Sequence, residues 1–81
     1  MAMTREQLGG TLRRMYDEAP SGEKVANIHL FGVKYIREIG GAGLTAGDVV
    51  KASGLQTSYG TEVNKGMNLS KYVVPKAAFA D

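Results

Sequence analysis

Cysteine is missing from this chain of 81 residues, and so are long apolar runs. Without cysteine the chain can form neither a disulfide nor a thiolate metal site. No stretch approaches the roughly 18 consecutive apolar residues that a membrane-spanning helix needs. The first residues, MAMTREQLGG, lack the basic start and apolar run of a signal peptide. We therefore expect a cytoplasmic protein that does not bind a membrane.

Motifs for catalysis and cofactor binding are equally scarce. The chain has no G-K-[ST] triplet for a Walker loop and no G-x-S-x-G elbow for a hydrolase. Residues 41–46, GAGLTA, fit the G-x-G-x-x-A dinucleotide pattern, but a helix is expected before them and the chain is too short for the surrounding sheet. His29 is the only histidine, so it cannot build the usual zinc site and is expected to pack or to lie on a helix surface. The sequence predicts no enzyme, no cofactor and no metal.

Charge points only weakly to a partner. The net charge is +2 and the pI is about 9.0, which permits a nucleic-acid partner without requiring one. Residues 1–40 are balanced, whereas residues 49–80 contain four lysines and a single acidic residue, Glu62. The second half is therefore the candidate anion-facing side, unless these lysines only solvate the surface. At this length we expect one domain over residues 1–81, for which self-association would be a natural supplement to stability.

Apolar spacing and capping residues predict two helices in the first half. In the first, Leu8, Leu12, Met15 and Tyr16 share a helical face, and the segment opens on a Thr4–Gln7 capping box and ends at Pro20. The second segment, GEKVANIHLFGVKYIREIGG, is expected to be capped by Ser21. Residues 28–36 also fit a strand, because they are rich in β-branched and aromatic residues. The caps favour the helix.

This second helix is apolar on several sides. A helix of that kind is either central to the fold or paired with another chain. We therefore predict that it contributes to the core or forms a homodimer through Leu30, Phe31 and Val33.

Two short helices are predicted next. Thr45 and Asp48 form a capping signature for the third helix, and Gly54 supplies the turn after it. Thr57 or Ser58 is expected to cap the fourth helix, with Gly66 as the left-handed residue after its end.

The remainder of the chain is predicted to be irregular. Residues 72–74 have β character before Pro75, and residues 75–81 are expected to be flexible unless Phe79 docks onto the core. The predicted fold is all-α, with a tri-helical core, an additional N-terminal helix and a short extended C-terminal segment.

Residues 48–55, DVVKASGL, resemble the first helix and turn of many bacterial repressors. The resemblance places a helix-turn-helix at about residues 45–66. Gly60 departs from it, because repressors usually have valine or isoleucine there, and the glycine would loosen the second helix. The longer pattern, from GEKVANIHLFGVKY to YGTEVNKGMNLSKYV, is similar to a family of small bacterial helix-turn-helix-like proteins. That likeness implies a compact domain and transfers no catalytic residues.

A DNA-binding helix-turn-helix would present the polar side chains of its second helix to double-stranded DNA. Amides and hydroxyls would bond base edges, and lysines would pair with phosphates. Glu62 argues against this interpretation unless it accepts from cytosine. The alternative is a protein–protein interaction module with the same tri-helical shape. The candidate DNA-binding residues are Gln56, Thr57, Ser58, Thr61, Asn64, Lys65, Lys51 and Lys71, and a transcriptional or other DNA-associated regulator is the predicted function.

Overall fold

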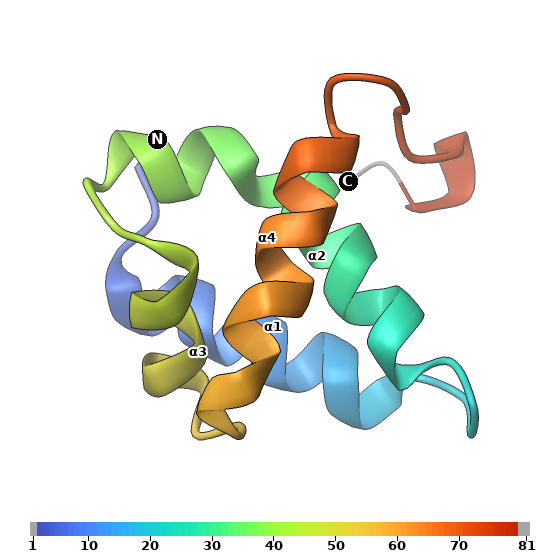
Figure 1. The fold of residues 1–81 in the computed structure, drawn as a ribbon, viewed down its shortest axis with the longest axis horizontal. Coiled ribbons are helices and arrows are strands. Elements are labelled where there is room, and N and C mark those ends of the chain that lie inside the picture. Colours follow the sequence, from blue (N-terminus) through green and yellow to red (C-terminus); the bar gives the residue numbers. More distant parts are fainter. Residues whose placement is uncertain (1, 80–81) are drawn as a thin grey trace.

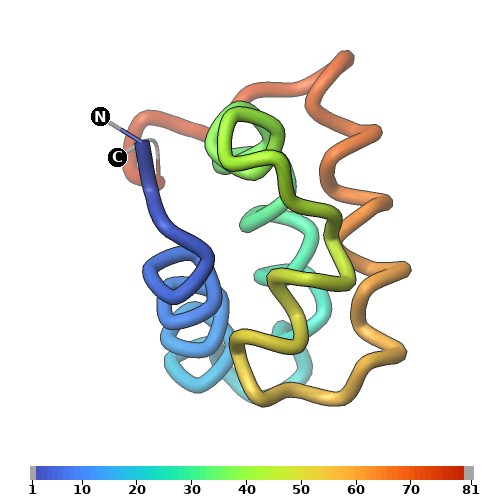
Figure 2. Tube along the Cα trace, turned by 90° about the vertical axis from the view of Figure 1, so that its left-hand side faces the viewer, coloured from blue at the N-terminus to red at the C-terminus, as the bar shows by residue number. Residues whose placement is uncertain are grey.

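Two pairs of helices build the molecule, whose computed structural model describes residues 2–79. Helix α1 (Arg5–Glu18) packs mainly against α3 (Ala46–Ser53), and α2 (Lys24–Gly41) packs mainly against α4 (Gly60–Leu69) (Figure 1). Figure 2 shows α1 and α4 on opposite sides of the molecule, with α2 and α3 between them. Residues 2–79 form helices and no strand, which confirms the predicted all-α class and settles residues 28–36 as helix.

The first helix begins as its sequence predicts. The Thr4 hydroxyl accepts a hydrogen bond from the Gln7 backbone N–H at 3.1 Å, and the Gln7 side-chain oxygen accepts from the Thr4 N–H at 2.9 Å. This reciprocal pair satisfies two donors at the start of α1.

The start of α2 differs from the prediction. Ser21 does not cap it: the helix begins at Lys24, and its N-cap residue, Glu23, makes no side-chain hydrogen bond. Gly22 has φ +85° and turns the chain between the two helices. The turn therefore replaces the predicted cap.

One apolar core joins all four helices. Phe31 is fully buried in it, and its ring lies 5.0 Å from that of Tyr35. The prediction that Phe31 lines a homodimer interface is therefore wrong, whereas Leu30 and Val33 remain partly exposed. The core residues are Leu8, Leu12, Ile28, Phe31, Ile39, Ala46, Val49, Val50 and Val63.

Glycines bring α2 and α4 into backbone contact. A Cβ added at Gly32 would lie 2.5 Å from the carbonyl oxygen of Val63, and one added at Gly66 would collide with the carbonyl oxygen of His29. Gly66 lies inside α4 and is buried, so its predicted role as the residue after a helix end is wrong. It is needed because the α2 backbone occupies the space of a side chain.

The chain after α4 returns toward the first two helices. Residues 73–76 have no regular structure and lead into the short 3-10 helix η2 (Ala77–Phe79). Phe79 is 55% exposed, and together with Leu30 and Tyr35 it lines a hollow of about 680 Å³ beside α1 and α2. It thus lies over the helices without entering the core. Residues 80 and 81 of the predicted flexible tail lie outside the described residues.

Candidate nucleic-acid interface

Helices α3 and α4 form the predicted helix-turn-helix. The Thr45 hydroxyl accepts from the Asp48 backbone N–H at 3.1 Å, and the Asp48 carboxylate accepts from the Thr45 N–H at 2.9 Å. These bonds hold the pKa of Asp48 below its usual value. The helix ends at Gly54, whose φ of +77° is left-handed and suits glycine. The turn therefore lies where the sequence predicts it.

Short hydrogen bonds and apolar contacts fix the turn itself. The Ser53 hydroxyl donates to the Val50 carbonyl at 2.6 Å and accepts from the Leu55 N–H at 3.1 Å. Val50 is fully buried, and Leu55 packs against the core. These contacts fix the direction in which the second helix leaves the turn.

The second helix begins with a 3-10 turn, η1 (Thr57–Tyr59), which continues directly into α4. Neither Thr57 nor Ser58 caps it, because no side-chain cap hydrogen bond exists at the start of η1 or of α4. Gly60 is buried, and a Cβ there would lie 3.7 Å from Gly47 Cα. A Cβ at this position would be in ordinary van der Waals contact with the α3 backbone, so α3 approaches the helix at the position where repressors usually have valine or isoleucine.

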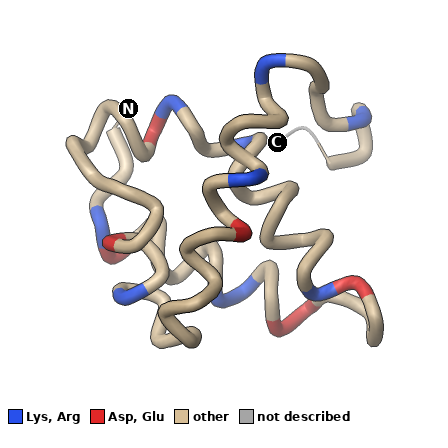
Figure 3. The backbone as a smooth tube through the Cα atoms, in the orientation of Figure 1, with Lys and Arg blue, Asp and Glu red and all other residues tan. Residues whose placement is uncertain are grey.

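The face of η1 and α4 that points away from the core is polar and exposed. All eight predicted DNA-binding residues are exposed, six of them on η1, α4 and the turn before them. Helical spacing brings Thr61, Asn64 and Lys65 to one side of α4. Lys51 lies in the last turn of α3, and Lys71 follows the end of α4. The charged residues of α4 are Glu62 and Lys65, and Figure 3 shows the rest of its tube in tan.

The structure adds Asn68 to this face. Asn68 is exposed and follows Asn64 by four residues, so the two amides lie one helical turn apart. The sequence contained this signal, but the helix was predicted to end at Gly66, which left Asn68 out. The exposed row on α4 is thus one turn longer than predicted.

Arg13, on α1, also lies close to the turn at Gly54. Its Nη1 atom lies 3.6 Å from the position that a Cβ at Gly54 would occupy. The same guanidinium group bonds Asp17 at 3.0 Å, and about half of the side chain is exposed. A basic group from α1 therefore lies beside the start of the polar face.

The Glu62 carboxylate bridges α2 and the edge of this face. Its Oε1 lies 2.7 Å from His29 Nε2 on α2, and its Oε2 lies 3.4 Å from Lys65 Nζ. The bond from His29, followed by the nearby lysine, holds the pKa of this carboxyl below its usual value. His29 is thus a partly buried residue that links two helices, in line with the packing role expected for it.

Tyr59 faces the interior side of the same helix. Its hydroxyl lies 3.1 Å from that of Tyr16, and the two ring centres are 5.5 Å apart. This hydroxyl pair raises the pKa of Tyr59. Tyr59 therefore joins α1 to the second helix.

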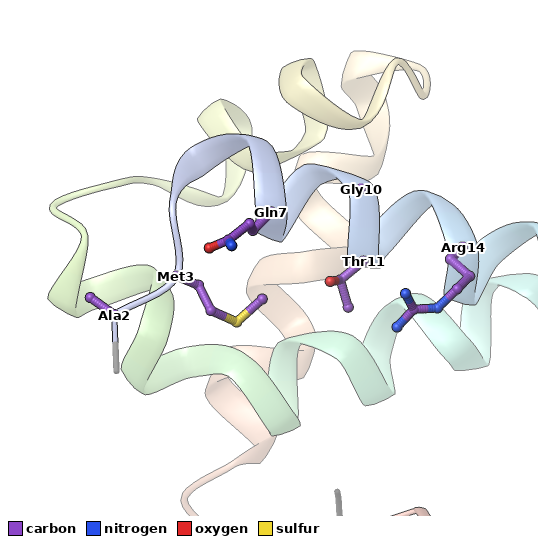
Figure 4. A pocket seen from close by; sticks show the side chains of 6 residues that line it. All are labelled: Ala2, Met3, Gln7, Gly10, Thr11 and Arg14. Carbon is purple, nitrogen blue, oxygen red and sulfur yellow. The ribbon is translucent and has the colours of Figure 1, made fainter.

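A separate hollow lies along α1. Figure 4 shows an open hollow of about 590 Å³ along α1, lined by Met3, Gln7, Gly10, Thr11, Arg14 and Ala2. None of the predicted DNA-binding residues lines it. Residues 2–79 contain no group of three or more His, Cys, Asp or Glu side chains that could hold a metal ion. Over the same residues no helix is both long and apolar enough to cross a membrane.

The comparisons with known proteins agree with the geometry. The model of a family described as an HTH-like domain matches residues 4–76, a span that includes all four helices. No curated protein and no solved structure matches the chain. Because the family model covers nearly the whole sequence, the chain belongs to the HTH-like domain family.

Proposed function

We propose that this chain binds double-stranded DNA through the outward face of η1 and α4 and acts as a DNA-associated regulator. The supporting observation is the exposed row of hydrogen-bonding side chains on the second helix of a helix-turn-helix. In DNA-binding members of this architecture, that helix enters the major groove. The row is Gln56, Thr57, Ser58, Thr61, Asn64, Lys65 and the added Asn68.

The chemistry of the row suits bases more than phosphates. Gln56, Asn64 and Asn68 are amides, and asparagine or glutamine can bond N6 and N7 of adenine together. Arginine, the commonest partner of guanine, is absent from residues 38–81, and the guanidinium of Arg13 beside the turn is bonded to Asp17. The proposed face therefore favours A·T base pairs, with Lys51, Lys65 and Lys71 supplying contacts to the DNA backbone.

A salt titration tests this proposal. Fluorescence anisotropy would measure the affinity for a random-sequence duplex at increasing salt. We expect binding at low ionic strength and a fall in log K with log salt, at a slope of about −0.9 for each phosphate contacted. Replacement of Lys51, Lys65 and Lys71 by alanine is expected to weaken binding and flatten that slope.

Arg14→Ala is a control of the same charge type, because Arg14 lies on α1, on the opposite side of the molecule from α4. It should leave the slope nearly unchanged. Absence of binding at low salt, or equal effects of Arg14 and the three lysines, would refute the proposal.

A second candidate is a protein-interaction module, and one observation favours it. Apolar side chains after α4 are open to solvent: Tyr72 is 82% exposed and Val74 is 85% exposed. On the remaining surface Leu30 and Val33 are partly exposed on α2 and could pair two copies of the chain.

Glutamate substitutions separate an interface from the core. Leu30→Glu should leave a folded monomer and dissociate any dimer that uses this surface, as measured by light scattering. Phe31→Glu should unfold the chain, because it places a charge in the core. A folded protein whose size in solution is the same with Leu30 and with Leu30→Glu would exclude this dimer.

A further inference from the structure

Glu62 is the one acidic residue of α4. In the proposed complex, Thr61 and Lys65 face the DNA groove. A flexible side chain at position 62 could extend toward the same groove. A carboxylate there would lie close to DNA phosphates and be repelled by them. The orientation of Glu62 therefore bears directly on whether the face can bind a nucleic acid.

The structure turns this carboxylate toward α2. His29 Nε2 lies 2.7 Å from Glu62 Oε1, and only 23% of the Glu62 side chain is exposed, against 59% for Lys65. The lowered pKa keeps Glu62 ionised, and an ionised carboxylate can only accept hydrogen bonds. His29 must therefore donate from Nε2–H. The second oxygen of the carboxylate lies beside a cation, Lys65. The charge of Glu62 in turn adds to the effect of Tyr16 in raising the pKa of Tyr59, in the turn before it.

The backbone holds His29 in the right place for this bond. Its carbonyl group packs directly against Gly66, where a side chain would not fit. Val63 meets Gly32 one turn away in the same manner. Since α2 and α4 touch through their backbones at both points, the His29 backbone is held in place against α4. The imidazole ring therefore starts from a fixed position beside Glu62, which its Nε2 contacts.

We propose that His29, which lies outside the helix-turn-helix, is a positioning residue for DNA binding: it holds the Glu62 carboxylate against α2 and away from the phosphates. The inference rests on the proposed function. It also explains how a helix with an acidic residue presents a face made of amides, a hydroxyl and a lysine. The partner it implies is a polyanion, double-stranded DNA.

The test compares four variants with the unaltered chain by anisotropy on a random-sequence duplex at low salt. His29→Ala should lower affinity about three- to tenfold, as expected for one freed and partly screened charge. Glu62→Gln in that background should restore the affinity. Glu62→Gln alone should change it less than about twofold, because the carboxylate is already held away from the DNA. His29→Gln retains an N–H donor and should bind nearly as well as the unaltered chain.

Thermal unfolding separates this role from a structural one. His29→Ala and the double variant both lose the bond between the helices, so both should melt at lower temperature. Only the double variant should recover DNA affinity. If affinity follows the melting temperature in all variants, His29 has a structural role and the inference is wrong.

Two further outcomes would overturn it. One is equal affinity of His29→Ala and the unaltered chain. The other is a gain in DNA affinity of more than about threefold for Glu62→Gln alone, with His29 unchanged. If the unaltered chain itself does not bind duplex DNA, the proposed function falls together with this inference. If it binds and His29→Ala binds equally well, only the inference falls.

Discussion

The two faces of α4 differ in how closely they pack against the rest of the molecule. Toward α2 the helix presents Val63 and Gly66, which are buried, and the neighbouring backbone is so close that a single extra carbon has no room. Away from α2 it presents Thr61, Asn64 and Asn68, which are exposed. One face determines where the helix lies, and the other is free to determine what it contacts.

This difference shows how a chain of 81 residues without disulfides can leave one face of a helix exposed. Backbone contact through glycine fixes the position of α4 with few side chains, so the remaining positions need not contribute to the core. Glu62 lies at the boundary between the two faces and is held on the inner side by His29. Substitutions on the inner face should therefore change stability, and substitutions on the outer face should change binding.

The largest expected effect is on the inner face. Gly66→Ala adds a Cβ that would collide with the His29 carbonyl, so α2 and α4 must move apart. Overpacking of this kind costs about 1–3 kcal/mol, and more where backbone must move. We expect the free energy of unfolding, measured with urea, to fall by at least about 2 kcal/mol.

Gly10→Ala is the matched control. Gly10 also lies inside a helix, but no atom outside α1 would come within 4 Å of its added Cβ. Alanine favours helix over glycine by about 1 kcal/mol, so this variant should be slightly more stable than the unaltered chain. If both glycine variants had the same stability, backbone contact would not be what holds α4 in place.

Local signals in the sequence account for much of this fold. Thr4 and Thr45 form the capping boxes that their spacing predicts, and Gly54 turns the chain where it was expected. Each of these depends on residues within four positions of one another. The exposure of the predicted DNA-facing side chains also follows from local polarity, although their binding to DNA stays a prediction.

Contacts between distant residues could not be predicted in the same way. Gly66 fits a helix end by the local rule, yet it is buried at a helix crossing against His29, 37 positions earlier in the chain. Phe31 and Leu30 are both apolar neighbours, and only the packing of α2 decides that one is core and the other partly exposed. The bond between His29 and Glu62 likewise joins residues 33 positions apart. No pairing pattern in one sequence indicates it.

A smaller effect is expected on the outer face, where two asparagines provide a paired test. Asn64→Ala should reduce the preference for A·T-containing duplexes by about 1–3 kcal/mol, the value of one good base contact, and should leave stability nearly unchanged. Asn27 on α2 instead donates to the Met15 carbonyl at 3.0 Å. Asn27→Ala should lower stability by about 1 kcal/mol and leave base preference intact. Competition between duplexes measures base preference, and urea unfolding measures stability. If Asn64→Ala lowered stability and Asn27→Ala lowered base preference, the division into two faces would be contradicted.

The smallest effect is expected at the boundary residue, Glu62, and it depends on pH. Its pKa is lower in the folded chain than in the unfolded chain, first through the bond from His29. A carboxyl of this kind contributes stability above its unfolded pKa, and the contribution is lost as pH falls through the folded pKa. Between pH 5 and 2, roughly, the stability of Glu62→Gln should therefore fall less steeply than that of the unaltered chain. Glu18→Gln, a control at the exposed end of α1, should retain the steeper fall, which chemical unfolding at a series of pH values would reveal. If the stability of Glu62→Gln and that of the unaltered chain fell equally steeply at acid pH, the bond to His29 would add no stability. Glu62 would then belong with the outer face.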